Sequence, residues 1–159
     1  MRRMILPVLA CALALVAARA AAEDGAQQVD AAWLKAIKAN DLNALVACYA
    51  PDAVMWLPGT PEAKGEKAIR AAYAGLLGAN TVVDASLSNV VYDVGGRNTQ
   101  AELGTAYGNF TLVLKPKAGG ANIVMQGRFL IAAKPVGGRW RYIADHASVE
   151  PPPAAAAAK

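Results

Sequence analysis

Apolar residues recur at helical spacing through the first half of the chain. In the first segment they lie three or four residues apart and form one stripe: Val29, Ala32, Trp33, Ala36 and Ile37. This pattern predicts an amphipathic helix over about residues 24–39. Asp41 is placed to cap a second helix, and a third helix begins at about Gly65. A short apolar strand over residues 53–57 lies between the second and third helices.

The second half of the chain has the pattern of strands. Four long runs rich in strand-forming residues cover about 81–94, 98–115, 122–135 and 139–149. They are separated by the diglycine pairs Gly95-Gly96, Gly119-Gly120 and Gly137-Gly138. Because glycine readily takes the positive φ angles of tight hairpins, the simplest topology is an antiparallel meander. Helices followed by a curved antiparallel sheet indicate an α+β fold rather than a doubly wound parallel sheet.

The two ends of the chain differ from the middle. Arg2 and Arg3 precede an apolar run from Ile5 to Ala18, and small residues follow it. This order is typical of a cleaved signal peptide, which we place at residues 1–22, and the run is too short to span a bilayer comfortably. We therefore expect a periplasmic or secreted protein. Its folded domain would cover residues 23–149, and a disordered Pro/Ala-rich tail would cover residues 150–159.

The charge of the chain excludes several classes of partner. Of the 16 basic residues three lie in the predicted signal peptide, which leaves 13 against 12 acidic residues, or about +1. Nucleic acids and anionic membranes need a clustered basic face, so we expect neither as a partner after signal cleavage. Cys48 would be the one cysteine of the mature protein and His146 is the one histidine. We expect no internal disulfide, no histidine-based metal site and no cofactor.

Five short blocks in order carry a family resemblance. They are Asn40-Asp41-Leu42, Pro51-Asp52-Ala53-Val54, Gly65-Glu66-Lys67-Ala68-Ile69-Arg70, Gly127-Arg128-Phe129 and the strand Trp140…His146-x-Ser148. With them the chain, over about Gln27 to Val149, resembles the SnoaL-like, ketosteroid-isomerase-like superfamily, whose cone fold is shared with nuclear transport factor two. The last strand is also similar to the association domain of calmodulin-dependent protein kinase type two. The resemblance implies a cystatin-like cone, with three N-terminal helices on a curved antiparallel sheet, an apolar cavity between them, and homodimers formed through the outer sheet face.

The acid–base groups of the isomerase are missing at the matching positions. That enzyme uses a shuttling aspartate, a tyrosine and a protonated aspartate. The resemblance places Leu57, Trp33 and Gln126 at these three positions. None of these side chains can supply the chemistry, so we do not expect this mechanism, and whether the protein is an enzyme stays open.

Arg128 is the first candidate for ligand binding. The resemblance implies that Gln126 and Arg128 point into the cavity together, and that Arg128 matches a pocket arginine of the kinase domain. Its guanidinium would bind a ligand carboxylate or phosphate, or would pair permanently with Asp145 or Glu102, which face the cavity in the same register. A carboxylate beside Arg128 would be a poor base, whereas one lying apart in apolar surroundings would have a raised pKa and could move protons.

Aromatic residues supply the rest of the predicted site. The expected cavity wall consists of Trp33, Met55, Trp56, Leu57, Tyr73 and Phe110, although such residues also serve as ordinary core. Strand alternation places Trp140, Tyr142 and His146 on the face opposite Asp145, where they would form a subunit interface unless a bulge shifts the register.

Three functions remain compatible with these observations. The first is a non-catalytic module that binds a small, partly apolar ligand in its cavity and forms a homodimer. The second is an isomerase, dehydratase or cyclase with Asp145 or Glu102 as general base. The third is an oligomeric assembly module. A carboxylate alone in an apolar cavity would favour the enzyme, and one held by Arg128 would favour binding or structure.

Overall fold

The structure, a computed structural model, describes residues 25–95 and 103–150. The predicted signal peptide, Glu102 and residues 151–159 of the predicted tail lie outside these residues. The helices are α2 (Gly25–Lys38), α3 (Leu42–Ala47) and α4 (Gly65–Ala79). The strands are β1 (Tyr49–Trp56), β2 (Ala63–Lys64), β3 (Asn80–Gly95), β4 (Leu103–Pro116), β5 (Ile123–Val136) and β6 (Arg139–Val149). Each predicted element is present, and β2, with two residues, is too short to have left a pattern.

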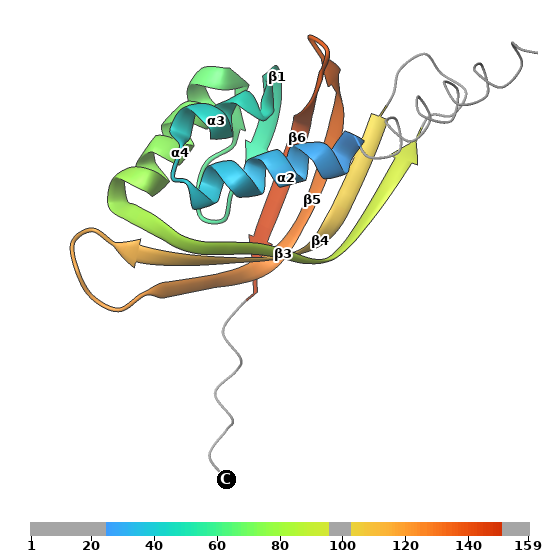
Figure 1. Cartoon of the computed structure of the whole chain (residues 1–159). Coiled ribbons are helices and arrows are strands. Elements are labelled where there is room, and N and C mark those ends of the chain that lie inside the picture. The colour runs from blue at the N-terminus through green and yellow to red at the C-terminus, as the bar shows by residue number, and fades with distance from the viewer. Residues whose placement is uncertain (1–24, 96–102, 151–159) are drawn as a thin grey trace, which may run out of the picture.

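The strands form one curved sheet in the order β2-β1-β6-β5-β4-β3. Strands β3 to β6 make the predicted antiparallel meander, and β1 adds to its edge by pairing with β6 in parallel. The sheet is therefore antiparallel except at this one pair, which differs from the expectation. All three helices lie on the concave side of the sheet (Figure 1). The α+β class and the arrangement of three helices on a curved sheet are confirmed.

Local sequence signals account for the turns. The Asp41 carboxylate accepts a hydrogen bond from the Ala44 backbone N–H at 2.9 Å and caps α3 as predicted. Asn40, just before it, has a φ of 54° and uses its side chain to bond both the N–H and the C=O of Val82 at the start of β3. This pair of bonds attaches the α2–α3 turn to the sheet.

A bulge in β6 decides which side chains face the helices. Ala132 pairs with Ala144, but its neighbour Ala133 pairs with Tyr142, so that Ile143 is an extra residue on β6. An extra residue shifts the alternation of side chains by one position. Tyr142 and Asp145 therefore face the same, inner side of the sheet.

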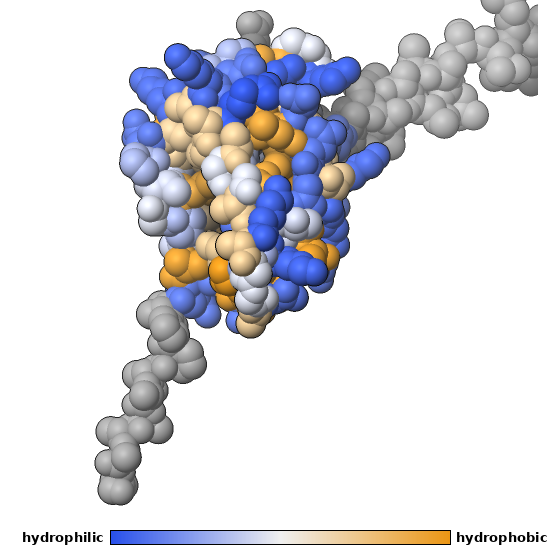
Figure 2. Space-filling model, turned by 90° about the vertical axis from the view of Figure 1, so that its left-hand side faces the viewer, coloured by the Kyte–Doolittle hydropathy of each residue, from blue (hydrophilic) through white to orange (hydrophobic). Residues whose placement is uncertain are grey.

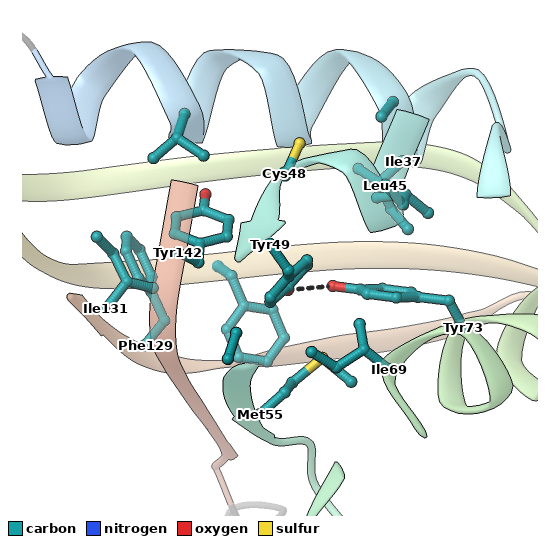
Figure 3. Close-up of a cluster of buried hydrophobic side chains, with 14 of the residues drawn as sticks. Ile37, Leu45, Cys48, Tyr49, Met55, Ile69, Tyr73, Phe129, Ile131 and Tyr142 are labelled. Atoms are coloured by element: carbon teal, nitrogen blue, oxygen red, sulfur yellow. Dashed lines mark hydrogen bonds between the residues drawn. The ribbon is translucent and has the colours of Figure 1, made fainter. Parts of the chain in front are cut away.

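The core lies between the helices and the concave face of the sheet. Its most completely buried large side chains are Ile37, Leu45, Met55, Ile69 and Tyr73, drawn in Figure 3. Burying each apolar side chain contributes roughly 1.5–3 kcal/mol. Within residues 25–95 and 103–150, no helix is long and apolar enough to cross a membrane.

Candidate active site

A cavity of about 560 Å³ opens between the helices and the sheet. Its walls come from α2, α4, the segment 57–63 and the inner faces of β3 to β6. On α4 the wall consists largely of small side chains, Ala68, Ala71, Ala72 and Gly75, which leave the space open. Figure 2, which views the side of the molecule that carries α4, shows apolar residues in a band bordered by hydrophilic ones. This volume lies within the range of small-molecule sites.

Asp145 reaches this cavity from β6. Its carboxyl is buried, and burial raises its pKa from 3.8 to about 6. A hydrogen bond of 2.5 Å from the Tyr49 hydroxyl to Oδ2 opposes that rise, and the charge of Asp30 adds to it. A carboxyl with such a pKa is mostly ionised at neutral pH and is a stronger base than an exposed aspartate.

Three aromatic side chains form a chain of hydrogen bonds that ends on Asp145. The Trp33 indole N–H donates to the Tyr73 hydroxyl at 2.7 Å, and the Tyr73 and Tyr49 hydroxyls lie 2.7 Å apart. Because the one hydroxyl proton of Tyr49 is donated to Oδ2 of Asp145, the Tyr73 hydroxyl donates to Tyr49, and the order of donors runs from Trp33 through Tyr73 and Tyr49 to the carboxylate. Figure 3 shows the two tyrosines directed toward one another.

The chain of hydrogen bonds leaves one oxygen of Asp145 free. Burial raises the pKa of both Tyr49 and Tyr73, so the two phenols stay protonated and remain donors. Among the described side chains none donates to Oδ1, the second carboxylate oxygen. Oδ1 is therefore the atom that a ligand in the cavity can reach.

A second carboxyl, Asp30, enters the cavity from α2. It lies one helical turn before Trp33 and two turns before Ile37, on the face that lines the cavity. Tyr142 donates to its Oδ1 at 2.6 Å, and burial raises its pKa, against the opposing effects of Tyr142 and Tyr92. Asp30 was not among the site residues predicted from the sequence, although an acidic residue inside an apolar helical stripe is a signal that could have identified it.

The prediction that Arg128 and Gln126 point into the cavity is wrong. Both are exposed on the outer face, where the Arg128 side chain is 74% exposed and its Nη2 lies 3.4 Å from Oε1 of Glu150. The alignment of β5 with the isomerase strand, which the resemblance implied, is wrong by one residue. An error of one residue reverses the side of the sheet that each side chain faces. The inward residues of β5 are instead the apolar Met125, Phe129 and Ile131 and the small Gly127, because these positions gain most from burial.

Because Arg128 lies outside the cavity, the cavity lacks the guanidinium that was predicted to bind an anion. Among the described residues, the cavity lining contains no lysine, arginine or histidine. Asp145 is therefore not paired with Arg128, and the cavity has two buried carboxyls, Asp30 and Asp145, and an exposed one, Glu62, instead of an acid and a base. The other candidate acid, Glu102, lies outside the described residues.

Several aromatic candidates also change position. Trp33, Leu57, Tyr73 and Phe110 line the cavity, but Trp56 is 39% exposed and donates to Glu62 at 3.1 Å. Met55 is fully buried in the core and does not line the cavity.

The predicted interface of Trp140, Tyr142 and His146 is wrong for two of its three members. Tyr142 lines the cavity because of the bulge at Ile143. Trp140 packs against α2, so closely that a Cβ at Gly25 would overlap its ring. His146 alone is exposed on the outer face, beside Trp56.

The comparisons with known proteins agree with this architecture. The model of the SnoaL-like domain matches residues 31–143, and the chain belongs to this family. A candidate scytalone dehydratase from Novosphingobium aromaticivorans is similar in structure, with a TM-score of 0.68, 14% identity, and coverage of 86% of each chain. A ketosteroid isomerase-like protein from Erwinia carotovora atroseptica has a TM-score of 0.64 and 19% identity, covering 82% of this chain and 98% of its own.

The kinase resemblance has a structural counterpart as well. A candidate calcium/calmodulin-dependent protein kinase II association domain from Xanthomonas campestris has a TM-score of 0.64 and 18% identity, covering 76% of this chain and 81% of its own. No curated protein sequence matches this chain. At these identities the structural likenesses establish the cystatin-like fold, which commonly binds small ligands and forms oligomers.

Proposed function

We propose that this protein is a periplasmic or secreted enzyme that moves a proton on a small, largely apolar substrate without a negative charge. Asp145 is its general base, and the reaction is of the isomerase or dehydratase type. The single observation that carries this proposal is the Asp145 carboxyl, buried in the apolar cavity with a pKa raised to about 6. The N-terminal apolar segment supports the location.

The surroundings of Asp145 favour catalysis over permanent structural pairing. A structural carboxylate at this depth would be expected to pair with a cation, and the described cavity lining has none. The donors that hold it are neutral hydroxyls, so its basicity is kept. Groups with such perturbed pKa values in a cleft are candidates for acid–base work.

The proposed chemistry is a proton transfer at carbon. Oδ1 of Asp145 removes a proton from a carbon next to a carbonyl group, and the substrate keeps the electron pair as an enolate. The protonated Asp145 then returns the proton to another carbon of the conjugated system, which completes an isomerisation. Apolar walls keep water away from the enolate, and the hydrogen-bond chain from Trp33 holds the carboxyl in place.

The test follows proton transfer directly. The purified protein is incubated in D2O with a β,γ-unsaturated cyclic ketone and, separately, with a β-hydroxy ketone, and deuterium uptake and product are followed by NMR. We expect catalysis that falls as the pH drops through about 6 and that Asp145→Asn lowers by about 10²–10⁴-fold. Asp52→Asn, which changes an exposed carboxyl, is the matched control.

A non-catalytic binding module is the competing function, and the cavity itself supports it. It predicts that the ketones bind, by calorimetry, without any exchange above the rate in buffer. Exchange that Asp145→Asn leaves unchanged would contradict the assignment of the base.

We also propose that the protein forms a homodimer through the outer face of the sheet. Paired residues form one exposed row across five strands: Val91, Tyr107, Leu130, His146 and Trp56. Such a row of apolar and aromatic side chains suits association with a second copy. Sedimentation equilibrium should show a dimer, and Leu130→Lys should convert it to a monomer. A monomeric parent protein would exclude the dimer and the assembly-module alternative with it.

A further inference from the structure

We propose that Asp30 forms a second polar subsite of the cavity, which binds a hydrogen-bond-donating group of the ligand, either a hydroxyl or a protonated amine. The ligand is accordingly neutral or cationic, and not a carboxylate or phosphate. This inference deepens the proposed function and depends on it only in taking the cavity as the substrate site.

One oxygen of Asp30 lacks a partner. The residue is 2% exposed, and the Tyr142 hydroxyl donates to its Oδ1. Oδ2 is buried and has no hydrogen bond of its own among the described residues, although the Tyr92 side chain lies near enough to the carboxyl to lower its pKa. Native proteins rarely leave a buried carboxylate oxygen unsatisfied, because such a group has lost its water. Since Asp30 lines the cavity, a group that satisfies Oδ2 can arrive with a ligand.

Packing alone does not explain an acid at this position. Its neighbours on the same face of α2 are Trp33 and Ile37, and both also line the cavity. A neutral acceptor such as asparagine would satisfy the Tyr142 hydroxyl on that face without burying a charge. The described lining offers Asp30 no cation as a permanent partner. The carboxyl is therefore better explained by recognition than by folding.

The two buried acids of the cavity are held by two neighbouring tyrosines. Tyr142 holds Asp30 and Tyr49 holds Asp145, and the two rings pack edge-on with centroids 5.2 Å apart. A ligand of modest size can therefore contact both carboxyls at once, with its donor group at Asp30 and its reacting carbon at Asp145.

The sign of the charge selects the class of ligand. Asp30 and Asp145 repel each other, which contributes to the raised pKa of Asp145. An anionic ligand would add a further negative charge beside these two buried carboxyls, in a described lining that has no cationic side chain, whereas a donor or a cation relieves the repulsion. The cavity consequently discriminates against acids.

Three probes with one apolar body test this inference: 2-naphthol, 2-naphthylmethylamine and 2-naphthoic acid. Their dissociation constants are measured by calorimetry at neutral pH. We expect the naphthol or the amine to bind at least about tenfold more tightly than the acid, the difference of one charge-assisted hydrogen bond. Tight binding of the naphthol identifies a hydroxyl ligand, and tight binding of the amine alone identifies a cationic one.

Variants assign the preference to Asp30. Asp30→Asn should weaken the binding of the probe that the parent protein prefers, so that this probe binds less than about threefold more tightly than the acid. Asp93→Asn, at an exposed carboxyl, should leave the dissociation constants of all three probes unchanged. If Asp30→Asn does not fold, Tyr142→Phe replaces it. This change frees Oδ1 and should strengthen amine binding.

Asp145→Asn separates this inference from the proposed function. It should retain the ranking of the three probes while losing proton exchange. Equal binding of all three probes by the parent protein, no binding by any of them, or an unchanged ranking in Asp30→Asn would each overturn the inference. None of these outcomes depends on whether exchange is observed.

Discussion

Replacing Asp145 by asparagine should stabilise the protein, and only above about pH 5. The pKa of this carboxyl is 3.8 in ordinary surroundings and about 6 in the fold. The folded chain therefore binds the proton more tightly than the unfolded chain, and the stability that this group contributes is lost as the pH rises from 3.8 to 6. A shift of about two units corresponds to about 3 kcal/mol. Asparagine keeps an acceptor for Tyr49 and carries no charge.

Urea denaturation between about pH 4 and pH 8 measures this effect as the free energy of unfolding. We expect Asp145→Asn to be within about 1 kcal/mol of the parent protein at the acidic end, and more stable by up to about 3 kcal/mol at the basic end. Asp52→Asn, at an exposed site, should show no such trend. A difference between variant and parent that is the same at every pH would refute the assignment of a buried, titrating carboxyl.

Three further substitutions test interactions that hold the site and the sheet around it. Tyr49→Phe removes the donor to the Asp145 carboxyl, so the NMR titration midpoint of that carboxyl should rise by about one unit; an unchanged midpoint would show that the bond has no effect. Gly127→Ala places a Cβ against the backbone of β6 and should cost about 1–3 kcal/mol in urea denaturation, whereas Gly78→Ala, with free space around it, should not destabilise. Asn40→Gly keeps the positive φ but loses both bonds to the start of β3 and should cost about 1–2 kcal/mol; equal stability would contradict their role.

The order of the elements could be predicted because local signals are strong. The stripe that includes Trp33 and Ile37 predicts α2, Asp41 caps α3, and the pairs Gly119-Gly120 and Gly137-Gly138 take the positive φ values that hairpins need. Each of these signals depends on residues close together in the chain. The packing of these elements against one another is compatible with the structure that each local signal favours.

The side-chain directions could not be predicted, because they depend on single positions. One extra residue, Ile143, brings Tyr142 to the side of Asp145, and an offset of one position moves Arg128 from the cavity to the surface. A slip of one residue reverses every side chain of a strand. Asp30 was not predicted for another reason. The apolar residues around it define the buried face of α2, and a single acidic residue among them is easily assigned to the exposed edge of that face.

The pKa of Asp145 tests the central claim most directly. Protein labelled with 13C at aspartate carboxyls is titrated by NMR, and Asp145→Asn assigns the resonance. A midpoint near 6 is expected for a carboxyl in apolar surroundings that can act as a base at neutral pH. A midpoint near 4, the value of an aspartate in water, would contradict it and leave the cavity without its proposed base.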